Sequence, residues 1–121
     1  MLDCIAVGIG GFVGSICRYL ISLIPMKTVG GFPLATLLTN IAGAFAIGLF
    51  AALFLKNPQL DSRLSLMLRT GLCGGFTTFS TFSLESFGLM KSGSWGMALL
   101  YVLLSCSLCI AAVLLGQSVV K

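Results

Sequence analysis

Four long apolar stretches, separated by short polar joints, set the pattern of this sequence. They cover residues 4–24, 33–55, 64–90 and 94–118. Each is near or above the roughly 20 residues that cross a hydrocarbon core as a helix. The pattern predicts an all-α membrane protein with four transmembrane helices, in one domain that covers residues 1–121.

The joints between the stretches hold polar residues, glycine and proline. They run from Pro25 to Gly31, from Lys56 to Arg63 and from Lys91 to Ser94. Joints this short predict that sequential helices are antiparallel neighbours. The first stretch has Asp3 in place of a basic n-region and is too long for a cleavable signal, so we expect it to be retained.

Composition restricts the function. The chain is 58% hydrophobic and 8% charged, which excludes a soluble globular domain. It has no His and three carboxylates, too few for general acid–base chemistry, so we expect no enzyme. Its basic residues are scattered, which is not typical of a nucleic-acid site. The five cysteines do not suggest a disulfide framework, and we interpret Cys106 and Cys109 as small apolar residues.

Basic residues are divided almost evenly between the two sides of the predicted bundle. One side carries Lys56, Arg63 and Lys121, with Arg69 near it, and the other carries Lys27 and Lys91, with Arg18 near it. The positive-inside rule orients a protein only where one side has an excess of Lys and Arg. The sequence therefore predicts that copies insert in both orientations.

The third stretch is predicted to be a broken helix, with the break near residues 73–78. Gly74 and Gly75 are followed by hydroxyl residues that weaken helix continuity. At membrane depth a break is tolerated only inside protein or beside a wet cavity, where unwound carbonyls can coordinate a cation. Close helix packing through the GxxxG of Gly71 and Gly75 is an equally good interpretation of the glycines.

Aromatic and hydroxyl side chains follow the break. Phe79 and Phe82 share one helix face. Ring edges carry the positive side of the aromatic quadrupole, so this pair can face a small anion, although phenyl rings in membranes more often face lipid or the core. The neighbouring polar candidates are Thr78, Ser80, Thr81 and Glu85.

Other polar residues fall inside the remaining stretches. Placing the Asn40 amide inside a membrane costs free energy unless it hydrogen-bonds to another helix or to a permeating ion. Arg18 either extends to the interface or attracts anions to a vestibule. Tyr101, Ser105 and Cys109 recur every four residues on one helix face, as a polar track or as interhelical hydrogen-bonding groups.

Three motifs together resemble the bacterial fluoride channel family known as Fluc or CrcB. They are GGFVGSICRY at 10–19, TLLTNIAGAFAIG at 36–48 and RTGLCGGFTTFSTFSLE at 69–85. The resemblance spans nearly the whole chain. It implies an antiparallel, dual-topology homodimer in the cell (inner or plasma) membrane, with two fluoride pores and a structural sodium ion at the dimer centre.

The resemblance also implies roles for single residues. The backbone carbonyls of Gly74 and Thr77 would bind the sodium ion, and Phe79 and Phe82 would line the pores. Asn40 would donate to fluoride, and Arg18 would lie near a vestibule. Tyr101 and Ser105 would belong to a polar track on the fourth helix, with Glu85 near the end of the pathway.

The expected function is fluoride export by passive electrodiffusion. A narrow, rigid lining would replace the hydration shell of fluoride. The main rival is a small proton-coupled multidrug or guanidinium exporter, another four-helix dual-topology dimer. Members of that class resemble one another in having a membrane-embedded Glu in the first helix, whereas the only carboxylate in this first stretch is Asp3, at its start.

Overall fold

The computed structural model describes all 121 residues and contains helices and no strands. Three helices are long and apolar enough to cross a membrane: α1 (Leu2–Ser22), α2 (Leu34–Lys56) and α6 (Trp95–Val119). A short 3-10 turn, η1 (Val29–Gly31), lies between α1 and α2. These findings confirm the prediction of an all-helical membrane protein.

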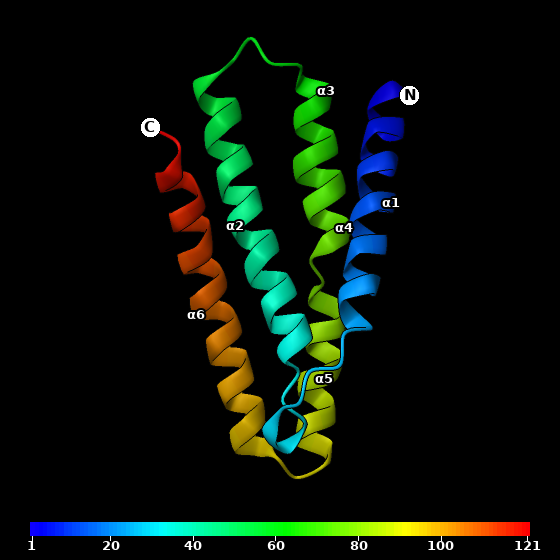
Figure 1. Cartoon of the computed structure of the whole chain (residues 1–121), viewed down its shortest axis with the longest axis vertical. Coiled ribbons are helices and arrows are strands. Elements are labelled where there is room, and N and C mark those ends of the chain that lie inside the picture. The colour runs from blue at the N-terminus through cyan, green and yellow to red at the C-terminus, as the bar shows by residue number, and fades with distance from the viewer.

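The third apolar stretch forms four consecutive segments. They are α3 (Ser62–Ser65), the π-helical η2 (Leu66–Cys73), α4 (Gly74–Phe76) and α5 (Phe79–Lys91). Together they run the length of the molecule beside α2 (Figure 1). Both termini and the α2–α3 connection lie at one end, as four passes require, and the other two connections lie at the opposite end.

Few side chains are buried within one chain. Sixteen of the 121 residues are buried, and the central cluster is Leu37, Phe82, Leu89, Ala98 and Tyr101, between α2, α5 and α6. Large apolar side chains such as Phe12 and Leu55 are exposed on the outside of the helices. A surface this apolar is stable only against lipid or another protein surface.

Helix α1 packs chiefly along η2 and α4, not along α2. Helices α1 and α2 are antiparallel, as expected, but the main contact of α1 is with the third segment and its contact with α2 is small. Glycine explains the difference, since a Cβ on Gly71 would lie 2.6 Å from the Val7 carbonyl oxygen. The missing side chains let the two backbones touch, as small residues do in membrane helix pairs.

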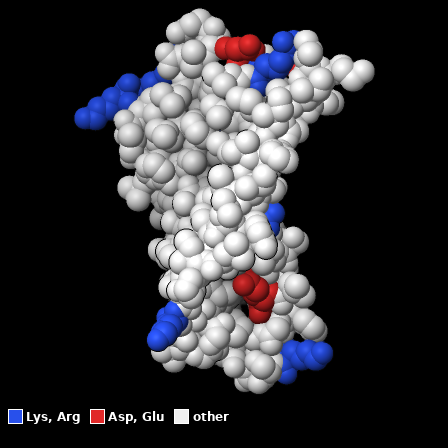
Figure 2. Space-filling model, turned by 45° about the vertical axis from the view of Figure 1, so that its right-hand side comes forward, with Lys and Arg blue, Asp and Glu red and all other residues white.

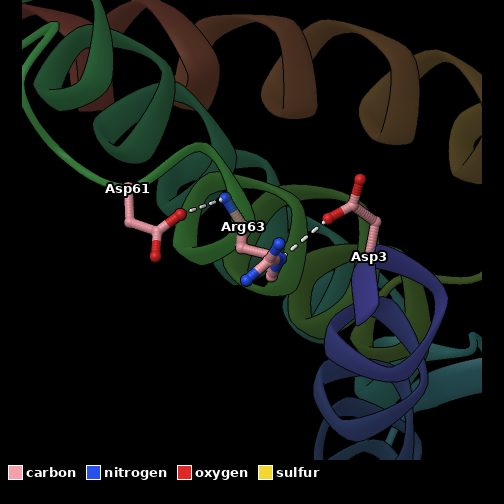
Figure 3. A network of polar contacts seen from close by, with 3 residues as sticks. All are labelled: Asp3, Asp61 and Arg63. Atoms are coloured by element: carbon pink, nitrogen blue, oxygen red, sulfur yellow. Dashed lines mark hydrogen bonds and ion pairs between the residues drawn. The ribbon is translucent and has the colours of Figure 1, made fainter. Parts of the chain in front are cut away.

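Most charged residues lie near the two ends of the molecule, whereas Arg18, Arg69 and Glu85 lie further along the transmembrane segments. Asp61 caps α3 by accepting a hydrogen bond from the backbone N–H of Arg63 over 2.8 Å. The Nε of Arg63 donates to Asp3 over 3.0 Å, which ties the start of α1 to the start of α3 (Figure 3). Basic side chains are visible at both ends of the face drawn in Figure 2.

The contact of α1 with η2 makes a prediction about stability. A Cβ on Gly10 would overlap the Met67 carbonyl oxygen and lie 2.8 Å from the Leu72 nitrogen, whereas a Cβ on Gly8 would meet nothing within 4 Å. Gly10→Ala is expected to destabilise the protein by about 1–3 kcal/mol, because backbone must move. Gly8→Ala is the control, since it adds the same methyl to the same helix. Unfolding in detergent measures both, and equal effects would contradict the packing account.

Candidate functional site

The interruption of the third transmembrane segment lies at Thr77 and Thr78. The chain is helical through Phe76, extended at Thr77 (φ −84°, ψ 156°) and Thr78 (φ −148°, ψ 115°), and helical again from Phe79. The hydroxyl oxygen of Thr78 caps α5 by accepting from the backbone N–H of Thr81 over 3.1 Å. The break falls at the end of the expected 73–78 range.

The glycines before the break serve helix packing. A Cβ on Gly75 would lie 2.6 Å from the Gly11 carbonyl oxygen, and Gly71 packs on α1 in the same way. A Cβ on Gly74 would meet nothing within 4 Å. Both interpretations of this motif therefore describe the molecule, because packing at Gly71 and Gly75 is followed directly by the break.

Asn40 joins α2 to the extended residues of the break. Its Oδ1 accepts from the backbone N–H of Thr78 over 2.9 Å, and its Nδ2 donates to the Thr78 carbonyl oxygen over 3.2 Å. The amide thus satisfies both backbone groups of a residue that has no helical partners. This is the interhelical bonding considered as the alternative for Asn40, and the second N–H of Nδ2 makes no hydrogen bond within the chain.

Several carbonyl oxygens at the break, those of Gly74 and Thr77 among them, accept no hydrogen bond within the chain. The Cys73 oxygen accepts from the backbone N–H and the hydroxyl of Thr77, over 2.9 and 2.8 Å. The N–H of Thr78, which would bond the Gly74 oxygen in a continuous α-helix, is taken by Asn40. The oxygens of Gly74 and Thr77 are left without a donor.

An open groove of about 460 Å³ lies along this side of the break. It is formed by α2, α6 and the residues from Cys73 to Phe82, and none of its lining side chains is charged. Phe79 is 79% exposed and Phe82 is 9% exposed, with ring centroids 5.4 Å apart. The remaining lining residues include Asn40, Gly74, Thr77, Thr78, Ser105, Cys106 and Cys109.

The Oγ of Ser105 is the one fully buried side-chain polar atom that has no hydrogen-bond partner. Its side chain is 6% exposed, it lines the groove, and its Oγ makes no hydrogen bond. A hydroxyl left unpaired in a protein interior is costly unless something else bonds it. Ser105 therefore offers the groove a free donor and acceptor.

A second, smaller cavity of about 110 Å³ lies beside α1. Thr78 lines both hollows. The guanidinium of Arg18 reaches the break here, because its Nε donates to the Gly75 carbonyl oxygen over 3.0 Å. The other lining residues are Tyr19, Ser22, Ala35, Thr36, Thr39 and Thr81.

The expected polar track is only partly placed in the groove. Tyr101 is fully buried behind Phe82, with ring centroids 5.1 Å apart, and its hydroxyl donates to Glu85 over 3.1 Å. Ser80 is exposed and lies 3.3 Å from the Thr78 hydroxyl. Neither cavity is lined by Tyr101, Glu85 or Ser80.

Sequence reasoning missed three residues near the site. Phe32 packs edge-on against Tyr101, with centroids 5.5 Å apart. Thr36 and Thr39 line the smaller cavity. Their spacing with Asn40 places all three near one helix face, and this signal was sufficient to find the two threonines. No signal in the sequence marks Phe32, which lies between η1 and α2.

Comparison with known proteins gives consistent matches. The FluC protein of Ruminiclostridium cellulolyticum, named a fluoride-specific ion channel, is 44% identical over 122 residues, covering 100% of this chain and 94% of the relative. FluC of Azobacteroides pseudotrichonymphae is 45% identical over 91% of this chain and 89% of its own. FluC of Clostridium perfringens is 37% identical over 100% and 95%.

A family model described as "CrcB-like protein, Camphor Resistance (CrcB)" matches residues 5–117, which include most of each transmembrane segment and the residues that line both cavities. The chain belongs to the CrcB-like family.

Proposed function

We propose that this chain is a subunit of a fluoride-selective channel, which exports cytoplasmic fluoride by passive electrodiffusion and catalyses no reaction. The relatives that match it over nearly their whole length are named fluoride-specific ion channels. The uncharged groove beside the broken helix supplies a polar path through an apolar molecule.

The observation that carries the proposal is the set of unpaired polar groups in an open groove. The carbonyls of Gly74 and Thr77 and the hydroxyl of Ser105 have no partner in the chain. At membrane depth such groups cannot face lipid. A second copy of the chain covers the groove, and the exposed ring of Phe79 provides apolar surface for that contact.

The second copy is inverted in this proposal. Basic residues occur at both ends of the molecule in nearly equal numbers, so neither end is favoured on the cytoplasmic side. A two-fold axis in the membrane plane places the same break of both copies at the same depth. The result is an antiparallel homodimer.

The carbonyls at the break fit a structural sodium ion. Hard cations prefer oxygen ligands, and unwound backbone carbonyls coordinate Na⁺ in discontinuous membrane helices. Gly74 and Thr77 each offer one oxygen without a donor. Two inverted copies would supply four, and the bound cation would balance the negative ends of the two α4 segments.

Fluoride passes, in this proposal, along neutral donors. Asn40, Phe79, Phe82 and Ser105 all line the groove, and they would offer the ion an amide N–H, ring edges and a hydroxyl. Weak, successive sites let an ion leave as well as bind, whereas a full positive charge would hold it. Tyr101 with Glu85, and the cavity of Arg18, Thr78 and Thr81 with the nearby Ser80, extend the pathway.

The rival exporter class finds no support in the structure. Asp3 is the only carboxylate on α1, and it pairs with Arg63 at the exposed end of the helix. Glu85 lies on α5 and accepts from Tyr101. No carboxylate is placed for proton coupling in the first helix.

The proposed function predicts selective flux. Purified protein in liposomes, with the membrane potential set by a potassium gradient and valinomycin, is expected to release fluoride and not chloride. A fluoride electrode and a chloride electrode measure the two rates in the same preparation. Equal rates for the two halides would reject selectivity, and no flux of either would reject the channel.

Replacing Ser105 distinguishes a role in fluoride transport from a role in protein stability. Ser105→Ala removes a hydroxyl that has no partner, so stability is expected to hold while fluoride flux falls about tenfold, the equivalent of about one hydrogen bond to the ion. Ser86→Ala is the control. The Ser86 hydroxyl already donates to the Phe82 carbonyl over 2.7 Å, so its removal is expected to affect stability and not fluoride flux. Unchanged flux in Ser105→Ala would remove Ser105 from the pathway.

The proposed inverted dimer predicts that one added charge fixes the orientation. Gln59→Lys in the α2–α3 connection and Ser92→Lys in the α5–α6 connection add a cation at opposite ends of the chain. Each variant alone is expected to insert one way and give little flux, and co-expression is expected to restore it. Labelling of a C-terminal tag from both sides of the membrane measures orientation, and wild-type labelling from one side only would contradict dual insertion.

A further inference from the structure

Arg18 is a cation on α1 with no carboxylate partner. The one ion pair in the molecule joins Arg63 and Asp3 and does not include Arg18. Arg18 makes a single hydrogen bond, from Nε to the Gly75 carbonyl oxygen over 3.0 Å, and it is partly buried. Placing a guanidinium inside a membrane-spanning bundle costs free energy, so a contact that Arg18 makes there is expected to have a structural or functional role.

The acceptor that Arg18 binds is one that a continuous helix would use. In an unbroken α-helix the Gly75 oxygen would accept from the N–H of Phe79, and the Gly74 oxygen would accept from the N–H of Thr78. Arg18 bonds the first acceptor, and Asn40 bonds the second donor. Side chains that insert into the helical hydrogen-bond ladder are a known cause of sharp kinks.

The packing of α1 brings Arg18 to this oxygen. A Cβ on Gly14 would lie 2.8 Å from the Phe76 nitrogen, and one on Gly75 would lie 2.6 Å from the Gly11 oxygen. Helix α1 therefore touches the backbone of α4 at its last residues. Arg18 is one turn beyond Gly14, beside the point where α4 ends.

We propose that Arg18 is a positioning residue for the cation site, which rests on the sodium ion of the proposed function. Its Nε–H holds the Gly75 carbonyl, keeps α4 from continuing into α5, and so leaves the Gly74 and Thr77 carbonyls free on the groove side. The hydrogen bond does this, and the charge of the guanidinium does not.

Three substitutions separate the hydrogen bond from the charge. Counting from Cβ, the Nε of Arg is the fourth side-chain atom, as is the Nε2 of Gln. Arg18→Gln therefore keeps a donor at the same place without the charge. Arg18→Met puts a methyl group there, and Arg18→Lys keeps the charge but moves the donor one atom further out.

The test measures how sodium stabilises the purified protein in detergent. The unfolding temperature is followed against sodium concentration, with N-methylglucamine replacing sodium at constant ionic strength. We expect the half-effect concentration of Arg18→Gln to stay within about threefold of wild type and that of Arg18→Met to rise about tenfold or more, one hydrogen bond's worth. Arg69→Met is the matched control, because Arg69 is exposed and makes no side-chain hydrogen bond.

Each outcome decides the proposal. An unchanged half-effect concentration in Arg18→Met overturns it, and so does an Arg18→Lys protein that matches wild type while Arg18→Gln does not, since the charge would then be responsible. If Arg18→Met fails to fold, the comparison of Gln with Lys gives the answer alone. A wild-type protein insensitive to sodium removes the cation site itself, and fluoride release from the same preparation reports separately on the channel.

Discussion

The structure depends on how a broken helix satisfies its backbone where no water is available. Thr77 and Thr78 leave the helical path in the middle of a transmembrane segment, and each exposed polar group there needs a partner. Asn40 bonds both backbone groups of Thr78. A side chain from another helix thus supplies the hydrogen bonds that the break lacks. The backbone oxygens that remain unpaired are those that no neighbouring side chain reaches.

Close backbone packing makes this support possible. Glycines on α1 and on the η2–α4 segment let the two backbones touch, and η2 takes a π-helical form along that contact. Helix α1 therefore belongs with the third segment rather than with α2. The same packing carries Arg18 to the end of α4, so the break is held from α1 as well as from α2.

The break presents opposite partial charges at one place. The C-terminal end of α4 carries partial negative charge on its carbonyl oxygens, and the N-terminal end of α5, across the same gap, carries partial positive charge. The groove beside it has polar groups but no charged side chain. The proposed function requires this site to hold a cation at its backbone and to pass a small anion along weak neutral donors.

The sequence by itself determined the membrane class and the helical segments, because about 20 apolar residues and short polar joints leave few alternatives. It also located the weak point of the third segment, since glycine and hydroxyl residues mark it. Only the tertiary structure decided which partners meet. Asn40 and Thr78 are 38 residues apart, and Arg18 and Gly75 are 57 apart. Phe79 and Phe82 share a helix face, yet one is exposed and the other buried. Helical periodicity gives the direction of a side chain, but neighbouring helices determine what it touches.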